Sequence, residues 1–303
     1  MAEAPFGAQA PLLIVAAATP LTDGGAQLDE AAIWPYVRFL TDGGADGIFA
    51  CGTTGEGVLL GTDERKRAAV LFRAALRGTL IVHAGAQTTR DTADLAAHAA
   101  EIGADGVAVI PPPYFLLDEV ALADHLVAAA RACAPLPFFI YCFAARSGYP
   151  VSLAAIERVR SAVGNLAGLK VSESPWERVE HYLGLDLPVF IGQEPLIPRA
   201  LAVGAVGAVS GLAAAFPDYV REVLDRPDEA GEARLERLRA TMESSGAPFI
   251  AAIKHVLGRL GVPIAPDVRA PLRQLNSDQA TRLDTALFQL DALVPAPGAR
   301  VGS

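Results

Sequence analysis

The sequence predicts an α/β protein, and within that class a (β/α)8 TIM barrel with an appended C-terminal helical region. Short apolar runs without polar alternation recur up to residue 210, as is typical of parallel strands covered on both faces. Longer amphipathic stretches separate these runs, which favours strand–helix repeats over hairpins. After about residue 226 the strand pattern stops, whereas the helical pattern continues to the end of the chain.

Eight apolar runs are the expected strands. Their number fits a closed barrel better than an open, doubly wound sheet, which remains the alternative. The runs cover Leu12–Ala17, Gly47–Cys51, Leu80–Ala84, Gly106–Ile110, Phe138–Cys142, Leu166–Val171, Val189–Gly192 and Ala205–Ser210. A Gly-Ala-Asp-Gly sequence recurs at 44–47 and 103–106, each time at a helix-to-strand turn, which supports one reused βα unit.

The stretches between the runs are the expected helices. Thr62 and Ser152 precede two of them with side chains that commonly cap helix N-termini. Within the barrel, the helices are expected at Asp29–Thr41, Asp63–Arg77, Asp91–Ile102, Glu119–Ala132 and Leu153–Val163, and beyond it at Glu229–Ser244, Pro248–Leu260 and Ser277–Leu293. No low-complexity linker separates the two groups, so we expect a catalytic barrel at 1–226 and a helical region at 227–303 packed on it.

Composition excludes several classes of function. A net charge of −9 argues against nucleic acid and anionic membrane surfaces as partners. Three cysteines form neither an even disulfide framework nor a Cys-x-x-Cys pair, and the first basic residue, Arg38, comes too late for a signal peptide. We therefore expect a cytoplasmic protein. The histidines show no metal-ligand spacing, so no metal site is predicted.

Lys170 is the most informative candidate for chemistry. The chain has three lysines among 25 basic residues, so arginine supplies most of its positive charge. A lysine inside an apolar strand suggests a need for an amine that can lose its proton and form an imine. Alternation along the strand places Ala167, Leu169 and Val171 toward the helices, and Leu166, Gly168, Lys170 and Ser172 toward the barrel interior. The structural alternatives are a side chain that extends to solvent or one that pairs with Glu173.

Two further features follow neighbouring strand ends. Tyr141 ends the fifth strand, where its hydroxyl could move protons beside the amine, although an ordinary core tyrosine is an equal alternative. The loop Gly52–Gly57 contains two threonines and three glycines, whose hydroxyl and N–H groups suit a carboxylate. Its spacing matches neither a Walker loop nor a dinucleotide fingerprint.

Taken together, these residues resemble the dihydrodipicolinate synthase / N-acetylneuraminate lyase family of pyruvate-dependent class I lyases. Four features occur in the order of that family: Gly-Thr-Thr-Gly-Glu at 52–56, Pro-Pro-Tyr at 112–114, the strand ending at Tyr141, and Gly-Leu-Lys at 168–170. The combination is specific, whereas no single motif is. The resemblance covers nearly the whole chain.

The resemblance implies a role for each matching position. Lys170 would form the Schiff base with pyruvate or another 2-oxo acid, and Tyr141 would relay protons. The remaining positions are Thr53 and Thr54 for the pyruvate carboxylate, Gly192 and Val209 for backbone contacts beside pyruvate, Tyr114 for a neighbouring subunit's site, and Ser172, Glu194 and Ser210 for substrate hydroxyls. Glu194 could equally cap its own helix. No cofactor is implied, because the protonated imine is itself the electron sink, and a homo-oligomer, tetramer or dimer, is expected.

One loop departs from the family pattern. Synthases usually have Tyr-Asn-x-Pro-x-Arg-Thr-Gly after the fifth strand, whereas this chain has Tyr-Cys-Phe-Ala-Ala-Arg-Ser-Gly at 141–148. Arg146 is retained where a synthase arginine binds the carboxylate of the second substrate, although a surface arginine is the alternative. The loop favours a catabolic aldolase for a hydroxylated 2-oxo (sugar) acid, with pyruvate and an aldehyde as its small-molecule substrates. The alternatives are 4-hydroxy-tetrahydrodipicolinate synthase, a deoxy-oxo sugar acid dehydratase, and a non-catalytic barrel that binds a 2-oxo acid.

Overall fold

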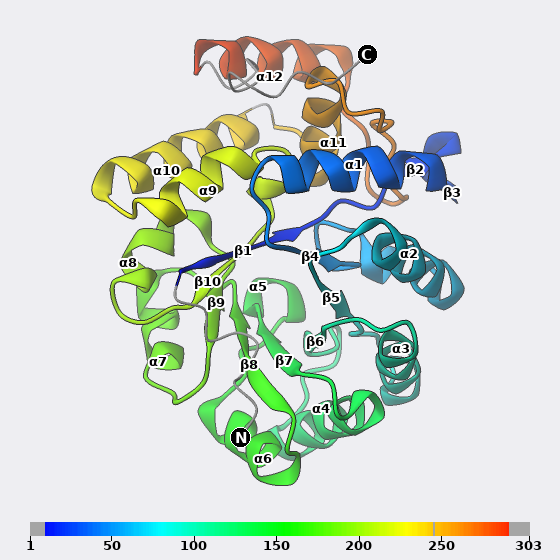
Figure 1. Cartoon of the computed structure of the whole chain (residues 1–303), viewed down its shortest axis with the longest axis vertical. Coiled ribbons are helices and arrows are strands. Elements are labelled where there is room, and N and C mark those ends of the chain that lie inside the picture. Colours follow the sequence, from blue (N-terminus) through cyan, green and yellow to red (C-terminus); the bar gives the residue numbers. More distant parts are fainter. Residues whose placement is uncertain (1–9, 245, 291–303) are drawn as a thin grey trace.

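Eight parallel strands close on themselves in the computed structural model, which describes residues 10–244 and 246–290 (Figure 1). Around the barrel the order is β1-β10-β9-β8-β7-β6-β5-β4. Their bounds are β1 Leu12–Ala16, β4 Gly47–Ala50, β5 Thr79–His83, β6 Gly106–Val109, β7 Phe138–Cys142, β8 Leu166–Val171, β9 Val189–Ile191 and β10 Gly207–Ser210. The predicted barrel is therefore confirmed, and the open doubly wound sheet is wrong.

Helices surround the barrel between successive strands. The five predicted in this part of the chain are confirmed to within two residues at each end: α1 Glu30–Asp42, α2 Thr62–Ala75, α3 Thr89–Glu101, α4 Glu119–Cys133 and α6 Leu153–Ala162. The structure adds the short α5 Ala144–Ser147, α7 Glu180–Leu183 and α8 Ile197–Leu201, then α9 Pro217–Asp225 and the antiparallel pair β2 Leu21–Thr22 and β3 Gln27–Leu28.

One of the two expected helix caps is correct. The Ser152 hydroxyl accepts a hydrogen bond from the Ala155 N–H at 3.1 Å, as predicted at the start of α6. Thr62, in contrast, is the first residue of α2 and not its cap. Gly61 occupies the cap position, and its N–H donates to the Glu64 carboxylate at 2.9 Å. The start of α2 is therefore stabilised by a first-turn carboxylate that accepts the N–H of the cap residue, and not by a hydroxyl at the cap.

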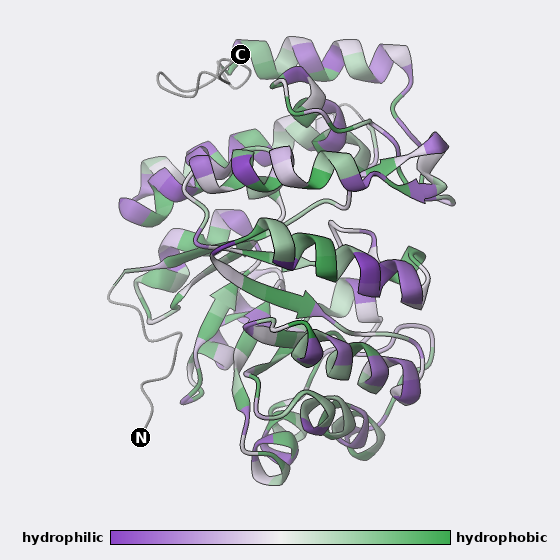
Figure 2. Ribbon diagram, turned by 45° about the vertical axis from the view of Figure 1, so that its right-hand side comes forward, coloured by the Kyte–Doolittle hydropathy of each residue, from purple (hydrophilic) through white to green (hydrophobic). Residues whose placement is uncertain are grey.

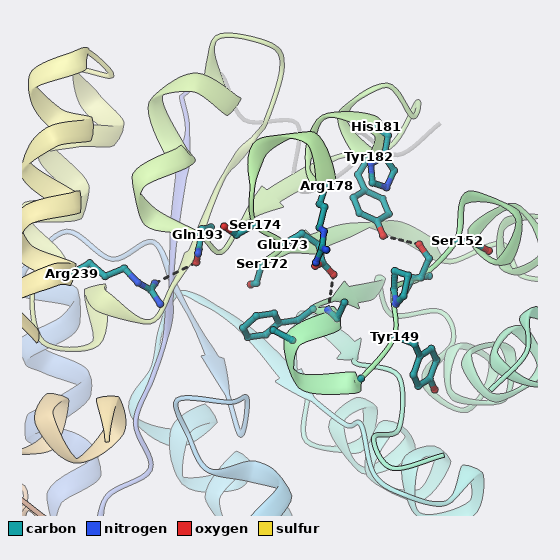
Figure 3. A pocket seen from close by; sticks show the side chains of 16 residues that line it. Tyr149, Ser152, Ser172, Glu173, Ser174, Arg178, His181, Tyr182, Gln193 and Arg239 are labelled. Carbon is teal, nitrogen blue, oxygen red and sulfur yellow. Dashed lines mark hydrogen bonds between the residues drawn. The ribbon is translucent and has the colours of Figure 1, made fainter. Parts of the chain in front are cut away.

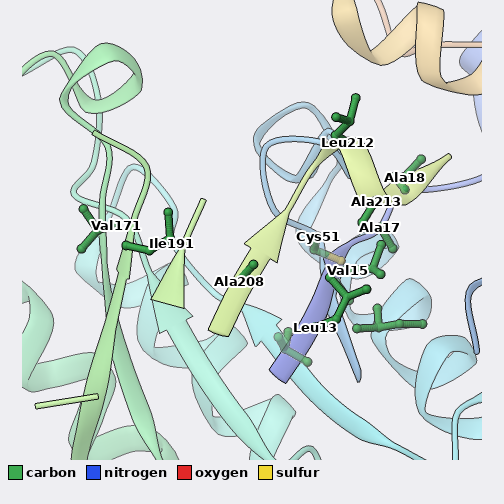
Figure 4. Packing of buried hydrophobic residues seen from close by; sticks show 14 of the residues in the cluster. Leu13, Val15, Ala17, Ala18, Cys51, Val171, Ile191, Ala208, Leu212 and Ala213 are labelled. Atoms are coloured by element: carbon green, nitrogen blue, oxygen red, sulfur yellow. The ribbon is translucent and has the colours of Figure 1, made fainter. Parts of the chain in front are cut away.

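Two apolar layers hold the barrel together. The inner layer fills the barrel with Ile14, Ala16, Phe49, Ile81, Ala108, Ile110, Phe139, Tyr141, Phe190 and Val209. The outer layer joins strands to helices and includes Leu13 and Val15 of β1 and Ala208 of β10 (Figure 4). Hydrophobic colour accordingly concentrates on the strands, and hydrophilic colour on the helices (Figure 2). Because side chains fill the barrel, small molecules can be bound only at its ends.

The faces of β8 differ from the prediction at the start of that strand. Phe138 pairs with Leu166 and Phe139 pairs with Gly168, so Ala167 is an extra residue in the ladder. Consequently Leu166 packs with the outer layer and Ala167 with the inner one, the reverse of what simple alternation predicts. The predicted alternation holds from Gly168 onward. This irregularity therefore leaves Lys170 beside Tyr141 on the interior face.

The three C-terminal helices are α10 Glu229–Ser244, α11 Phe249–Arg259 and α12 Ser277–Gln289. Helix α10 packs against α8, α9 and the short 3-10 helix η4, Glu194–Leu196. The end predicted for the last helix, Leu293, lies outside the described residues. The division at 226/227 stays a prediction. Within the described residues, no helix is long and apolar enough to cross a membrane.

Candidate active site

The Lys170 amine lies between two aromatic rings inside the barrel mouth. Its nitrogen is 4.0 Å from the centre of the Phe49 ring and 3.9 Å from that of Tyr141. The side chain neither extends to solvent nor pairs with Glu173, whose carboxylate instead accepts the Ala144 N–H at 2.7 Å. Burial lowers the pKa of Lys170 to about 7, and the negative charge of Glu194 opposes this fall. Much of the amine is therefore unprotonated at neutral pH.

Tyr141 connects the amine to the loop after β4. Its hydroxyl lies 3.4 Å from the Thr53 hydroxyl. Burial raises the pKa of Tyr141 to about 12, although hydrogen bonds with Thr53 and Ser172 oppose the rise. The phenol therefore keeps its proton at neutral pH and can donate it to a reacting oxygen. Tyr141 belongs to the inner apolar layer and its hydroxyl has polar partners, so its role in moving protons stays a prediction.

A buried ion pair holds the loop that contains Thr53 and Thr54. Glu56, in the left-handed region at φ 57°, places its carboxylate 2.6 Å from the Lys254 amine of α11. The same carboxylate accepts the Arg269 N–H at 2.6 Å, and Lys254 also donates to the Asp267 carbonyl at 2.6 Å. Both side chains of the pair are fully buried. The C-terminal region therefore fixes the loop from outside the barrel.

Glu194 forms a second polar centre at the ends of β9 and β10. One carboxylate oxygen accepts the Ser210 hydroxyl and the Leu212 N–H, each at 2.9 Å. The other is 2.7 Å from the Arg239 guanidinium. The alternative that Glu194 caps its own helix is wrong, because Gln193 occupies that position and no side chain caps η4. The carboxylate instead binds Ser210 at the end of the following strand and Arg239 of α10.

Gly192 permits a close approach between two site elements. A Cβ atom built there would lie 2.0 Å from the Ser172 hydroxyl oxygen. We therefore expect Gly192→Ala to displace Ser172 beside Lys170. If pyruvate is the substrate, as the family resemblance implies, kcat/KM should fall by about tenfold or more, because small misplacements are costly in active sites. Steady-state kinetics on folded protein would measure the loss. Gly164→Ala, which places a methyl group in open space, is the matched control. Wild-type kinetics in both variants would contradict this close contact.

A cavity of about 800 Å³ opens beyond these residues (Figure 3). Its lining includes Phe143 and Ser172 from two strand ends, Arg178 and Gln193 from the following segments, and Arg239 from α10. Ser172 is the predicted site residue in this lining. Lys170 lies two residues before Ser172 on β8 and is not itself a lining residue. The cavity wall carries hydroxyl, carboxylate, amide and guanidinium groups, and Ser172 connects it to the strand that carries the amine.

Two predicted residues are exposed at the surface. The Tyr114 side chain is 86% exposed, at φ 88°, and packs against the Phe115 ring. Arg146 is exposed, and its guanidinium lies 5.7 Å from the centre of the Phe143 ring. Within one chain the structure thus gathers Lys170, Tyr141, Thr53, Ser172 and Gly192, together with Thr54, Glu194, Ser210 and Val209 at adjoining strand ends, and leaves Tyr114 and Arg146 at the surface.

Three residues near the site were missed from the sequence. Lys254 had a signal, since it is one of only three lysines. Arg239 had none, because it is one arginine among many on a charged helix. His83 was placed on a strand but given no role. Its ring meets Tyr141 edge-on at 6.0 Å, and its Nδ1 lies 3.1 Å from the Cys51 carbonyl oxygen. Burial and the nearby charges of Arg65 and Lys170 hold the pKa of His83 well below its usual range.

Side chains that could bind a metal do not gather in the described part of the chain, where no three His, Cys, Asp or Glu residues form a suitable group.

Comparisons with known proteins agree with this geometry. A model of the Dihydrodipicolinate synthetase family matches residues 11–290. An uncharacterized DapA-like lyase of Halobacterium salinarum is 33% identical, covering 89% of this chain and 91% of its own. 4-Hydroxy-tetrahydrodipicolinate synthase 1 of Streptomyces coelicolor is 32% identical, covering 95% of both chains. Among solved structures, YagE, a prophage protein of E. coli K12 in complex with pyruvate, superposes with a TM-score of 0.85 at 26% identity, covering 94% of this chain and all of its own.

Proposed function

The chain belongs to the dihydrodipicolinate synthetase family of class I lyases, which form a Schiff base on a lysine, and from this premise we propose that Lys170 is that lysine. The single observation that supports this choice is the buried amine between Phe49 and Tyr141, whose pKa of about 7 leaves it nucleophilic at neutral pH. The chain is an enzyme of this family, so the non-catalytic barrel is set aside.

Imine formation uses the groups around the amine. The free Lys170 amine attacks the ketone carbon of pyruvate and gives a carbinolamine. Tyr141, hydrogen-bonded to Thr53, donates a proton to the departing hydroxyl, which leaves as water, and the protonated imine remains. The Tyr141 phenolate then takes a proton from the adjacent methyl carbon, which gives an enamine. The enamine carbon attacks the aldehyde carbon while Tyr141 returns the proton to the aldehyde oxygen, and water hydrolyses the resulting imine to release the 2-oxo acid from Lys170. Reversal of these steps cleaves a 2-oxo acid into pyruvate and the aldehyde.

The pyruvate carboxylate is assigned to the loop after β4. The hydroxyl and backbone N–H groups of Thr53 and Thr54 suit an anion, and the loop is held in place by Glu56. Gly192 and Val209 contribute backbone atoms from β9 and β10. This arrangement needs no cofactor, because the protonated imine accepts the electron pair released at the adjacent carbon.

For the second substrate we favour a hydroxylated aldehyde, so that the enzyme is a catabolic aldolase for a hydroxylated 2-oxo (sugar) acid. Ser172 in the cavity wall offers a partner for substrate hydroxyl groups, and Glu194 and Ser210 are assigned to such groups by the family resemblance alone. Arg146 is assigned to a distal carboxylate near the cavity. Tyr114, which is exposed on its loop, is assigned to the active site of a second copy of this chain. The enzyme would then be a homo-oligomer, either a tetramer or a dimer. We place it in the cytoplasm.

A second candidate is 4-hydroxy-tetrahydrodipicolinate synthase, which joins pyruvate and aspartate semialdehyde. The retained Arg146 and the relationship to a Streptomyces coelicolor protein of that name favour it. A deoxy-oxo sugar acid dehydratase of the same family is a third possibility, since it would share the imine on Lys170.

Two measurements test these proposals. Borohydride reduction with pyruvate, followed by peptide mass analysis, should give a pyruvyl adduct on Lys170, and an adduct on another lysine would refute the assignment. Aldehydes added singly with pyruvate then identify the second substrate. We expect turnover of sugar-derived aldehydes, whereas turnover of aspartate semialdehyde alone would establish the synthase. Consumption of a deoxy-oxo sugar acid without release of pyruvate would indicate the dehydratase.

A further inference from the structure

Helix α10 places one guanidinium at the edge of the barrel mouth. Arg239 extends from this helix to the segment after β9, where Figure 3 shows it directed toward Gln193. Its Nη1 lies 2.7 Å from the Glu194 carboxylate, and its Nε lies 3.0 Å from Glu243 on its own helix. Glu194 is 1% exposed, whereas the Arg239 side chain is 29% exposed. The C-terminal region therefore supplies the cation that faces a buried carboxylate of the barrel.

We propose that Arg239 is a positioning residue for Lys170 that acts through Glu194. This inference rests on the proposed role of Lys170 in imine formation. Glu194 is bound on its other oxygen by Ser210 and by the Leu212 N–H. These two hydrogen bonds and the ion pair with Arg239 hold the carboxylate in place, and the positive charge of Arg239 offsets part of the negative charge that acts on the amine.

Among the charged and titratable groups around the amine, Glu194 is the one whose charge acts on the protonation of Lys170. Lys170 lies near the neutral His83 of β5 and the protonated phenol of Tyr141 of β7. Glu194 begins η4 directly after β9, the strand in which Phe190 pairs with Lys170, so its carboxylate lies at the same end of the barrel as the amine. Arg65 acts on His83, and Arg146 acts on Tyr141. Glu194 is the carboxylate whose charge stabilises the ammonium form of Lys170. On α10, Glu243 shares the guanidinium of Arg239 with it.

The direction of the effect follows from these charges. When the positive charge of Arg239 is removed, the Glu194 carboxylate acts on Lys170 without a counter-ion. The ammonium form is then stabilised, so the free amine predominates only at higher pH. The reactivity of the amine would thus depend on correct docking of α10 against the barrel.

The test compares the pH dependence of Lys170 in four variants by two methods. The first is borohydride trapping of pyruvate, and the second is labelling of Lys170 by a small acylating reagent, which requires no imine. We expect Arg239→Met and Arg239→Gln to raise both pH midpoints by about half a unit or more. Arg239→Lys keeps the charge and should restore the wild-type midpoint. Arg237→Met removes an exposed arginine of the same helix and is the matched control.

A further variant separates an electrostatic effect from a structural one. In Glu194→Gln the midpoint should fall below that of the wild type, and adding Arg239→Met to it should change the midpoint little. Unchanged labelling midpoints in folded Arg239→Met and Arg239→Gln would overturn the inference. Absence of a pyruvyl adduct on wild-type Lys170, with the labelling shift still present, would refute the proposed function and establish only the electrostatic effect of Arg239 on the Lys170 amine.

Discussion

Lys170→Met should lose at least about a thousandfold of the turnover with pyruvate while keeping the native fold, because a thioether cannot form an imine. Methionine has similar length and no charge, so it can occupy the space between the Phe49 and Tyr141 rings. Steady-state kinetics and borohydride trapping would measure the loss. Lys170→Arg should be equally inactive, since a guanidinium does not deprotonate at neutral pH. A pyruvyl adduct and wild-type turnover in folded Lys170→Met would contradict the mechanism.

The same variant should be more stable than the wild type at neutral pH. In the folded protein Lys170 has a pKa of about 7, against 10.5 for an ordinary lysine. Between these values the unfolded chain binds more protons than the folded one, so the free energy of unfolding rises with pH. Below about pH 7 the folded protein carries the full free-energy cost of burying the Lys170 ammonium, on the order of a few kcal/mol. Lys170→Met has no ammonium to bury and does not carry this cost. Denaturant unfolding at several pH values would measure this gain, with Lys66→Met on the outer helices as control.

Lys254→Met should lower the free energy of unfolding by about 3–5 kcal/mol, because it leaves the Glu56 carboxylate buried without its cation. The loop that contains Thr53 and Thr54 would also lose its anchor, so the KM for pyruvate should rise. Chemical denaturation and steady-state kinetics would measure the two effects separately.

A double variant distinguishes loss of charge balance from loss of packing. Lys254→Met combined with Glu56→Gln removes both charges, while the amide can still accept the Arg269 N–H. We expect it to recover much of the lost stability. A double variant as unstable as Lys254→Met alone would mean that packing, and not the unpaired carboxylate, accounts for the loss.

Local patterns in the sequence were sufficient for the barrel and for the environment of Lys170. Eight apolar runs and their separating helices depend on neighbouring residues, and the interior face of Lys170 follows from alternation within one strand. The prediction from alternation fails at Ala167, because the irregularity at that residue depends on how β8 pairs with β7. Alternation alone carries no information about the partner strand, so Leu166 and Ala167 were assigned to the wrong faces.

The ion pairs at the site could not be predicted from local sequence patterns, because their partners are far apart in the chain. Glu56 and Lys254 are 198 positions apart, and Glu194 and Arg239 are 45 apart. In each case a carboxylate after a barrel strand meets a cation on a C-terminal helix, and neither partner has a motif that identifies the other. The rarity of lysine indicated that Lys254 was unusual, but only the fold identifies its partner. Tyr114 and Arg146 remain assigned by family resemblance alone.

The origin of both cations in the C-terminal helices has a consequence for synthesis of the protein on the ribosome. The barrel strands emerge first, and they are followed by Arg239 and then by Lys254. Until those residues leave the exit tunnel, Glu56 and Glu194 would have to remain hydrated or stay buried without a counter-charge. The loops at the carboxyl ends of the strands therefore cannot adopt their final structure as each βα unit is completed. We expect this half of the barrel to close only after Lys254 has left the exit tunnel.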